Sequence, residues 1–344
     1  MKKLLFLYTE LADYFVNCLN LLAQDPELEI HLVFWPVKSE APFQFSFNDK
    51  IQLYQRADYN KQTLHALSQE IAPQLLFCSG WRDKAYLSIA KHYRSSIPSI
   101  SAMDNHWKGS LRQQIARVIS PLTLKRYFSH IWIPGQAQKE YALKLGFKKE
   151  QILSGFYVAN QQRFEALFRQ REDYPKNFIF VGRYIPHKGI YDLWQAFIEL
   201  KEEYPNDWTL TCLGTGSDWD QRIQHPDIKH LGFIQPQDMS KHILNASVFI
   251  LPSHFEPWGV VVHEMAYAGL AMICSSEIGA SRQFLKEGEN GFSFAAHSLD
   301  ELKNAMRKFI QMEEAQILKM GDASHDIAQS LTPQTWVNTL KDLI

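Results

Sequence analysis

Short apolar runs alternate with amphipathic segments along most of the chain. Runs such as KLLFLY, QLLFCSG and SVFILPS are apolar at nearly every position, which is typical of strands buried on both faces of a parallel sheet. Between them, apolar side chains recur every three or four residues, a spacing that predicts helices. The alternation therefore predicts an α/β fold whose parallel sheets carry helices on both faces.

Ten strand-like runs are present, at residues 3–8, 29–35, 74–80, 97–103, 130–135, 177–183, 208–214, 228–233, 247–253 and 271–276. Helical patterns fall between or after them, at 10–24, 61–71, 82–93, 136–145, 189–203, 239–245, 260–269 and 299–312. Ten strands with their helices are more than a single doubly wound sheet usually contains, so we expect two doubly wound, Rossmann-like domains. The polar segment 164–177 is followed by a new predicted strand, so we place the domain boundary in this segment. The predicted domains are residues 1–165 and 176–325.

Composition narrows the class of protein. The chain has 344 residues, of which 46% are hydrophobic and 21% charged, and a formal net charge of -1, so nothing global favours a nucleic-acid partner. Its four cysteines show no CxxC spacing, which fits a reducing cytoplasm. The opening MKKLLFLYTELADYF has too short an apolar core for a signal peptide, and no run is long enough to span a membrane.

The segment FIFVGRYIPHKG places two cations after a buried strand. Gly182 ends the strand, Arg183 follows directly, and Lys188 opens a helix five residues later. Ligands of open α/β sheets bind beyond the carboxyl ends of the strands. A guanidinium and an ammonium at that edge suit an anion with several oxygens. The alternative interpretation is a solvated loop with two ordinary surface cations.

The segment PSHFEPWGVVVHEMAYAG carries two carboxylates around a predicted helix start. Gly259 permits close approach of a ligand to backbone N–H groups at Val260, and a helix N-terminus favours negative charge. Glu264 lies about one turn further on, where it can accept hydroxyl hydrogen bonds such as those of a ribose diol. Glu256 lies on the loop before the helix. The alternative is one loop glutamate and one helix glutamate paired with a lysine.

Together these two segments resemble the family 4 (group 1) retaining glycosyltransferases of GT-B fold. The Gly-Arg, Lys-Gly and Pro-Ser elements and the two glutamates match that family in order and spacing. The segments LGTGSDWD, HLGFI and GENGFSF fall where the family has the corresponding strand ends. The resemblance is clearest over residues 176–296. It implies two Rossmann-like domains facing across a cleft, with a C-terminal helix, within 326–344, crossing back to the first domain.

The resemblance also implies roles for individual residues. Arg183 and Lys188 would neutralise the diphosphate of a nucleotide-sugar, Glu264 would bind the ribose hydroxyls, and Glu256 would contact the donor sugar. The remaining donor-binding residues implied are Gly182, Gly259, Val260, Phe233 and Ile234, the last two meeting the base through their backbone. The reaction implied is transfer of a sugar to a hydroxyl acceptor with retained anomeric configuration. No metal or other cofactor is expected, because the cations and a helix N-terminus can stabilise the leaving diphosphate.

The N-terminal half supplies fewer candidates. Asp104 and His106 follow a predicted strand, and the resemblance places such residues opposite the donor sugar; His106 can equally be a packed or solvent-facing histidine. Many relatives have a glycine-rich loop after the first strand, where this chain has Thr9 and Glu10. Another family position, an acid near Gly279, is Gln283 here. The segment LGTGSDWD has two glycines and no third, so we interpret it as a tight turn rather than a dinucleotide loop.

Residues 108–128 carry five cations and no acid. Apolar side chains recur through this segment at helical spacing, so it can form a basic amphipathic helix that contacts an anionic membrane, or a core-facing helix with a solvated basic face. The first alternative suits a lipid-linked acceptor and a cytoplasmic protein at the inner face of the membrane, in surface polysaccharide or lipid-linked glycan synthesis. A GT-B enzyme of another kind, such as a sugar-nucleotide epimerase, and a non-catalytic nucleotide-sugar-binding protein remain alternatives. The base, sugar and acceptor are not determined by the sequence.

Overall fold

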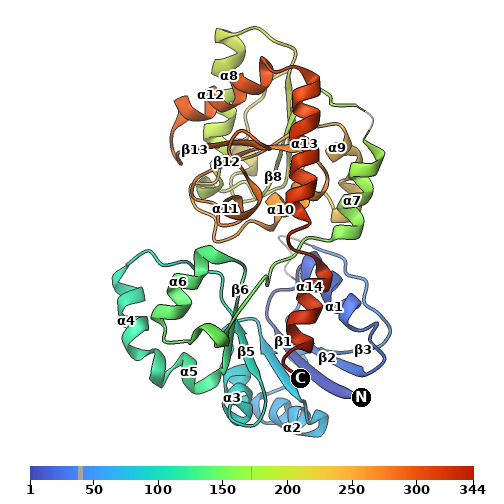
Figure 1. The fold of residues 1–344 in the computed structure, drawn as a ribbon, viewed down its shortest axis with the longest axis vertical. Coiled ribbons are helices and arrows are strands. Elements are labelled where there is room, and N and C mark those ends of the chain that lie inside the picture. The colour runs from blue at the N-terminus through green and yellow to red at the C-terminus, as the bar shows by residue number, and fades with distance from the viewer. Residues whose placement is uncertain (38–41, 172) are drawn as a thin grey trace. The chain divides into compact units, whose positions relative to one another are not determined.

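The computed structural model describes residues 1–37, 42–171 and 173–344. Contacts divide the chain into two compact units: unit 1 comprises Met1–Val158 and Pro333–Ile344, and unit 2 comprises Ala159–Thr332. Each unit is built on a parallel sheet with helices packed against it (Figure 1). The expected α/β class with two doubly wound units is confirmed. The domain limits inferred from the sequence stay predictions, because compactness does not show which segments fold on their own.

Unit 1 contains a seven-stranded sheet in the order β3-β2-β1-β4-β5-β6-β7. Its strands are β1 (Lys2–Tyr8), β2 (Leu28–Phe34), β3 (Ile51–Gln55), β4 (Leu75–Cys78), β5 (Ser99–Ala102), β6 (His130–Ile133) and β7 (Ile152–Ser154). Its helices are α1 (Asp13–Leu22), α2 (Lys61–Ile71), α3 (Lys84–Tyr93), α4 (Leu111–Ile119), α5 (Leu124–Tyr127), α6 (Gln136–Lys144) and α14 (Pro333–Lys341), with short 3₁₀ turns η1 (Arg56–Asp58), η2 (Ser120–Leu122) and η3 (Lys149–Gln151). The last helix of the chain packs beside α1 (Figure 1).

Unit 2 contains a six-stranded sheet in the order β10-β9-β8-β11-β12-β13. Its strands are β8 (Asn177–Val181), β9 (Thr209–Leu213), β10 (Ile228–His230), β11 (Val248–Leu251), β12 (Ala271–Ser275) and β13 (Gly291–Phe294). Its helices are α7 (Gln161–Gln170), α8 (Ile190–Glu203), α9 (Ser240–Leu244), α10 (Val260–Tyr267), α11 (Ser281–Phe284), α12 (Leu299–Ile310) and α13 (Glu314–Ala328), with 3₁₀ turns η4 (Pro186–Lys188), η5 (Trp219–Gln221) and η6 (Pro236–Asp238). Helices α8 and α12 pack together, and α10 packs on α7 and α13 (Figure 1).

All ten predicted strand runs form strands. Among the described residues, three further strands lie outside those runs, although the resemblance had placed GENGFSF, which contains one of them, at a strand end. The three strands are β3, β7 and β13, and each lies at an edge of its sheet. An edge strand is covered less completely than a central one, so its sequence lacks the continuous apolar run that marks buried strands. In β3 only Ile51 is buried, and β7 has no buried residue.

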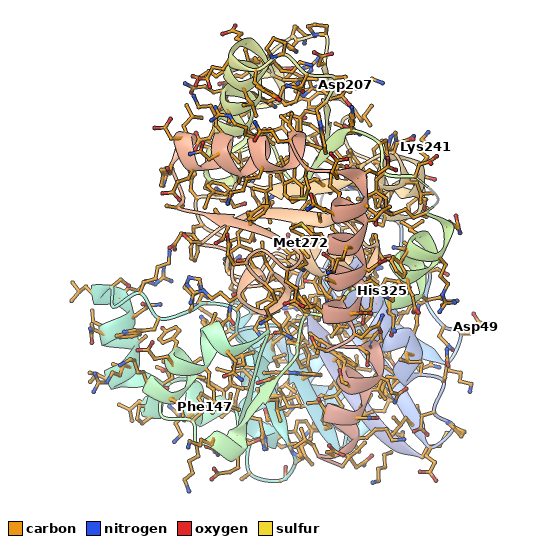
Figure 2. All side chains as sticks on the ribbon, turned by 45° about the horizontal axis from the view of Figure 1, so that its top comes forward. Asp49, Phe147, Asp207, Lys241, Met272 and His325 are labelled. Carbon is orange, nitrogen blue, oxygen red and sulfur yellow. The ribbon has the colours of Figure 1, made fainter. Side chains whose placement is uncertain are left out.

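The central strands form the cores of the two units. In unit 1 every residue of β4 and β5 is buried, and Phe147 packs into the same core (Figure 2). In unit 2 every residue of β11 and β12 is buried, including Met272 (Figure 2). The two buried sheets therefore form the rigid part of each unit, and binding or catalytic residues are expected on the loops at the carboxyl ends of the strands. Within the described residues, every helix is too short or too polar to cross a bilayer.

Candidate functional site

The sheet of unit 2 has a switch point between β8 and β11. After β8 the chain builds β9 and β10 on one side of the sheet, and it then crosses back to build β11, β12 and β13 on the other side. The loops that follow β8 and β11 therefore diverge in opposite directions from adjacent strand ends. Such divergence opens a crevice at the carboxyl edge, where ligands of doubly wound sheets bind.

The loop after β8 is held against the loop after β11 by a glycine and a hydrogen bond. Gly189 adopts the left-handed conformation at φ 66° and precedes α8. A Cβ atom at this position would overlap the carbonyl oxygen of Pro252, so only glycine allows this approach. Beside it, the His254 backbone N–H donates to the His187 carbonyl oxygen at 2.9 Å. The Lys-Gly pair of the sequence motif is thus a point of close backbone contact.

Lys188 and Glu256 form an ion pair at this switch point. Their side chains are 14% and 16% exposed, so the pair is shielded from bulk water although it can still be reached. Charges in such surroundings interact more strongly than on an open surface. The sequence assigned the two residues separate roles and did not predict that they pair, because 68 residues separate them.

Arg183 extends the cluster of charges. The side chain is exposed, and its charge reaches His187. Burial, followed by the charge of Lys188, lowers the pKa of His187, and Arg183 and His254 lower it further, whereas Glu256 raises it. His187 is therefore more often neutral than an ordinary surface histidine. His187 was not among the predicted site residues; its position directly before Lys188 was the available signal.

The loop after β11 continues alongside the next loop before α10 begins. The Glu256 N–H donates to the Glu277 carbonyl oxygen at 3.1 Å, and the Gly279 N–H donates to the Glu256 carbonyl oxygen at 3.1 Å. This backbone pairing holds Glu256 in place. Gly259 then caps α10 in the left-handed conformation, at φ 89°.

Helix α10 presents its N-terminus at the same edge of the sheet. Val260 is its first residue, so the backbone N–H groups of its first turn have no partner within the helix. Glu264 lies one turn further on and is half-buried. The predicted order of loop carboxylate, helix N-terminus and helix carboxylate is thus present on one continuous segment.

The loop after β10 lies beside the loop after β9, which in turn lies beside the end of β8. The Gly214 N–H donates to the Gly232 carbonyl oxygen at 2.8 Å, and a Cβ atom on Gly214 would overlap the Gly182 carbonyl oxygen. Phe233 and Ile234 follow Gly232 directly. The segment LGTGSDWD therefore supplies close backbone packing between strand ends, as the interpretation of a tight turn expects.

The structure accordingly gathers the unit 2 candidates on the loops at one edge of the sheet. Lys188 and Glu256 are in contact, and α10 begins shortly after Glu256 in the chain. The charges of Arg183 and Lys188 both act on His187. Whether these residues bind a donor stays a prediction, which is taken up below.

Unit 1 has its own switch point, between β1 and β4, and a pocket of about 920 Å³ lies there. Thr9 follows β1, and its backbone N–H and hydroxyl both bond to the Ser79 hydroxyl at 2.9 Å. The pocket is lined by Tyr8, Thr9, Glu10, Tyr14, Ser79, Gly80, Trp81, Arg82, Asp104, Asn105, Arg112 and Tyr157, among others. The loop without glycine therefore still borders a pocket, and Glu10 adds a carboxylate to it.

Asp104 and His106 differ in their surroundings. Asp104 lines the pocket and accepts a hydrogen bond from the Tyr157 hydroxyl at 3.2 Å. Burial raises the pKa of Tyr157 well above its usual value, so this hydroxyl remains a donor. His106 is buried, and its backbone carbonyl accepts a bond from Gln113 Nε2 at 2.8 Å. The packed histidine allowed by the sequence matches this burial, and a role toward a ligand stays a prediction.

Helix α4 does not face the core of unit 1, so the core-facing interpretation is wrong. No residue of α4 is buried. The apolar side chains of α4 are exposed, at 76% for Leu111 and 77% for Val118, and Ile115 and Ile119 are also open to solvent. Leu122, shortly after the helix, is 76% exposed. The segment also contributes Arg112, Gln113, Ala116 and Ile119 to the lining of the pocket. An apolar stripe among basic residues is therefore presented next to the pocket.

Comparison with known families gives a match over residues 162–323, to the model described as glycosyl transferases group 1. These residues lie within unit 2 and contain every unit 2 candidate named above. The match confirms the resemblance that the two sequence motifs suggested.

Among curated proteins, the glycogen synthase of Mycobacterium tuberculosis is 32% identical over 143 residues, which are 40% of this chain and 34% of that protein. An uncharacterised glycosyltransferase of Haemophilus influenzae is 27% identical over 155 residues, 43% of each chain. The chain thus matches between about a third and two fifths of the length of these relatives.

Solved structures resemble the whole chain at low identity. Sucrose-phosphate synthase from Thermosynechococcus elongatus has a TM-score of 0.74 at 13% identity, covering 100% of this chain and 98% of that one. HepE of Anabaena, in complex with UDP and glucose, has a TM-score of 0.72 at 15% identity, covering 99% of both chains. Likeness at this level of identity shows the fold, and the expected GT-B fold is confirmed.

Proposed function

We propose, because residues 162–323 match the model of group 1 glycosyltransferases, that the protein transfers a sugar from a nucleotide-diphosphate sugar to a hydroxyl acceptor with retention of anomeric configuration. The observation that carries this proposal is the Lys188–Glu256 pair at the β8/β11 switch point of unit 2. A cation suited to phosphate and a carboxylate suited to sugar hydroxyls lie side by side there, and doubly wound sheets bind their ligands at such switch points.

The donor is assigned to unit 2. Lys188 and Arg183 neutralise the diphosphate, together with the N–H groups at Gly259 and Val260. Glu256 accepts hydrogen bonds from hydroxyls of the transferred sugar. An arriving diphosphate competes with Glu256 for the ammonium of Lys188, which frees the carboxylate to bind the sugar.

The nucleoside is assigned to the remaining loops of the same edge. Glu264, half-buried one turn into α10, accepts hydrogen bonds from the ribose diol, for which two carboxylate oxygens are suited. Gly182 brings its backbone close to the nucleotide, and Phe233 and Ile234 meet the base through backbone groups. HepE was solved with UDP and glucose, which makes UDP-glucose the first donor to test.

The chemical step breaks the bond between the anomeric carbon and the diphosphate oxygen and forms a bond from that carbon to the acceptor oxygen. Negative charge grows on the diphosphate as the first bond breaks, and Lys188, Arg183 and the α10 N-terminus stabilise it. The acceptor proton passes to the departing diphosphate, and no protein side chain is assigned as general base. In this scheme the transfer requires no metal or other cofactor.

The acceptor is assigned to the pocket of unit 1. Its lining combines the carboxylates of Glu10 and Asp104 with Trp81 and Tyr14, and aromatic faces beside hydrogen-bonding groups suit a carbohydrate. As the resemblance implies, Asp104 is assigned to substrate binding and the buried His106 to catalysis.

The exposed apolar stripe of α4 supports contact with an anionic membrane surface and a lipid-linked acceptor. Basic residues of 108–128 flank the stripe, and such helices lie in the interface between headgroups and acyl chains. The pocket borders the same helix, so a lipid-borne sugar could enter it while its lipid stays in the bilayer. A place at the membrane and a role in glycan assembly remain part of the proposal.

A panel of UDP-, GDP- and ADP-sugars tests the function. A donor present at 100 times its dissociation constant should raise the unfolding free energy by about 2.7 kcal/mol, and the same donor should be hydrolysed slowly without acceptor. Stabilisation with neither hydrolysis nor transfer would favour the non-catalytic binding protein. Interconversion of the donor to another sugar nucleotide would favour the epimerase. No stabilisation by any member would contradict the assignment of the donor site.

A further inference from the structure

Three side chains with metal-ligating atoms meet in unit 2 outside the proposed donor contacts. Asp192 belongs to the first turn of α8, His254 to the loop after β11, and His297 to the turn between β13 and α12. One ligating atom from each lies within 4.8 Å of the other two. Three separate segments of the chain thus contribute one potential ligand each.

Their contacts are close and specific. His254 Nε2 and Asp192 Oδ2 are 2.7 Å apart, and the rings of His254 and His297 lie with centroids 3.7 Å apart at an interplanar angle of 32°. Two imidazole nitrogens and one carboxylate oxygen form a donor set typical of zinc and neighbouring transition metals. Hard cations such as Mg²⁺ and Ca²⁺ prefer oxygen ligands alone.

The backbone at His297 is an independent observation. His297 has φ 67°, and it is one of two non-glycine residues with positive φ among the residues that the structure describes. Positive φ is uncommon outside glycine, although histidine adopts it more readily than most residues, and unusual backbone conformations tend to cluster at ligand sites. The Ser298 N–H bonds to the Ala295 carbonyl oxygen at 3.0 Å, and the Ser298 side chain caps α12. These bonds hold the turn that brings the His297 ring over His254.

We propose that Asp192, His254 and His297 bind one divalent transition-metal ion, for which Zn²⁺ is the best match. Ligands at about 2.0–2.2 Å from a tetrahedral ion lie about 3.4 Å from one another. Side-chain rotation, chiefly of the exposed His297, brings the three atoms to that spacing. Three protein ligands leave a fourth position for water.

The ion takes no part in the proposed sugar transfer, and the proposal does not rest on that function. The effect of the ion is to hold together the loops next to the proposed donor site. The His254 N–H already bonds to the carbonyl oxygen of His187, next to Lys188, and Glu256 follows His254 by two residues. A bound ion therefore ties α8, the loop after β11 and the turn before α12 together behind the Lys188–Glu256 pair.

Metal titration of the full chain, prepared without a histidine tag, tests this site. Co²⁺ is added first, because its visible absorption bands report tetrahedral coordination, and Zn²⁺ is then measured by calorimetry. The expected result is one Co²⁺ per chain, displaced by one Zn²⁺. The variant Asp192→Asn keeps the shape of the side chain. The variant His297→Asn removes the imidazole, and asparagine tolerates the left-handed conformation at position 297.

Each variant should weaken metal binding by at least about 10–100-fold, the loss seen when only an outer partner of a ligand is removed. The matched control is His242→Ala, a half-buried histidine of α9 in the same unit, which should bind as the wild type does. Circular dichroism checks that all variants are folded. Absence of a saturable one-to-one site, or equal binding by the wild type and both asparagine variants, would overturn the proposal.

Discussion

At the scale of single residues, the Lys188–Glu256 pair links the fold to the proposed chemistry. Each side chain alone would be a shielded charge of one sign, which is costly. Together they neutralise each other while the donor is absent, and a diphosphate can replace the carboxylate as partner of the ammonium. The pair therefore holds a cation at the switch point of the sheet, and the attraction between the two charges offsets part of their desolvation cost.

Lys188→Ala removes the cation that stabilises the leaving diphosphate. We expect kcat to fall by about 10²–10³, as when one electrostatic donor is lost from an active site. Transfer or donor hydrolysis measures the effect, and circular dichroism checks the fold. The control is Lys176→Ala, since Lys176 is an exposed lysine of unit 2 whose partner is Asp207. Near-normal turnover of Lys188→Ala would contradict the role of Lys188.

The buried side chain of His263 makes the stability of unit 2 depend on pH. Its Nδ1 accepts a bond from the Ala159 N–H at 3.2 Å, and its Nε2 lies 3.1 Å from the Ala328 carbonyl oxygen. These partners require the neutral ring with the proton on Nε2. Burial lowers the pKa of His263 from 6.5 to about 3, so protonation is disfavoured in the folded state.

Unit 2 should consequently lose stability as the pH falls below 6.5. The folded pKa is lower than the unfolded one, so the unfolded chain binds the additional proton first, and the contribution of His263 is complete only above about pH 6.5. At pH 5 the loss should be about 2 kcal/mol. Denaturant unfolding of wild type and His263→Gln at pH 7 and 5 measures it, because glutamine can keep one donor and one acceptor without titrating. Equal pH dependence of the two proteins would disprove this coupling.

At the scale of elements, exposure rather than periodicity distinguishes α4 from other helices. Its apolar residues recur at the spacing expected of a packed helix, and the sequence alone allowed a core-facing position. The structure leaves those residues open, whereas Ala116, on another side of the same helix, packs against the core that contains Phe128 and Tyr141. A stripe of this kind among cations has the features of a membrane-surface helix.

Replacing Leu111, Val118 and Leu122 together by glutamine should abolish binding to vesicles that contain anionic phospholipid. The unfolding free energy should change little, since exposed substitutions usually stay within about 0.5 kcal/mol each. Vesicle co-sedimentation at low and high salt measures the binding. Neutral phosphatidylcholine vesicles serve as the control surface, because the basic residues attract anionic lipid. Equal vesicle binding by the variant and the wild type would refute membrane contact through α4.

At the scale of the whole molecule, the chain both begins and ends in unit 1. Helix α14 packs beside α1 (Figure 1), and its Trp336 is only 1% exposed. The indole Nε1 donates to the Phe156 carbonyl oxygen at 3.1 Å, and the ring lies 4.9 Å from that of Trp132. The last twelve residues, 333–344, are therefore part of unit 1, and Trp336, Val337 and Leu340 are buried in it.

Trp336→Ala should lower the unfolding free energy of unit 1 by about 3–5 kcal/mol, the range for removal of a buried large aromatic side chain. Denaturant unfolding followed by circular dichroism measures the loss. Trp35→Ala is the comparison, because Trp35 is 42% exposed and should cost clearly less. A loss below 1 kcal/mol for Trp336→Ala would show that α14 contributes little to unit 1.

The sequence by itself determined the α/β class, the ten main strands and the positions of the motif residues at strand ends and at the start of α10. These features depend on local patterns, because a buried strand or an amphipathic helix imposes its own spacing of apolar side chains. Local glycine and charge patterns likewise indicated which loops carry the candidate site.

Only the tertiary structure decided which of these segments meet. It supplied the edge strands β3, β7 and β13, the pairing of Lys188 with Glu256, the exposure of α4, and the meeting of Asp192, His254 and His297. The physical reason is that contacts between distant segments depend on strand order and crossovers. Strand order follows from the packing of the whole sheet, and it leaves no periodic signature in any one stretch of sequence.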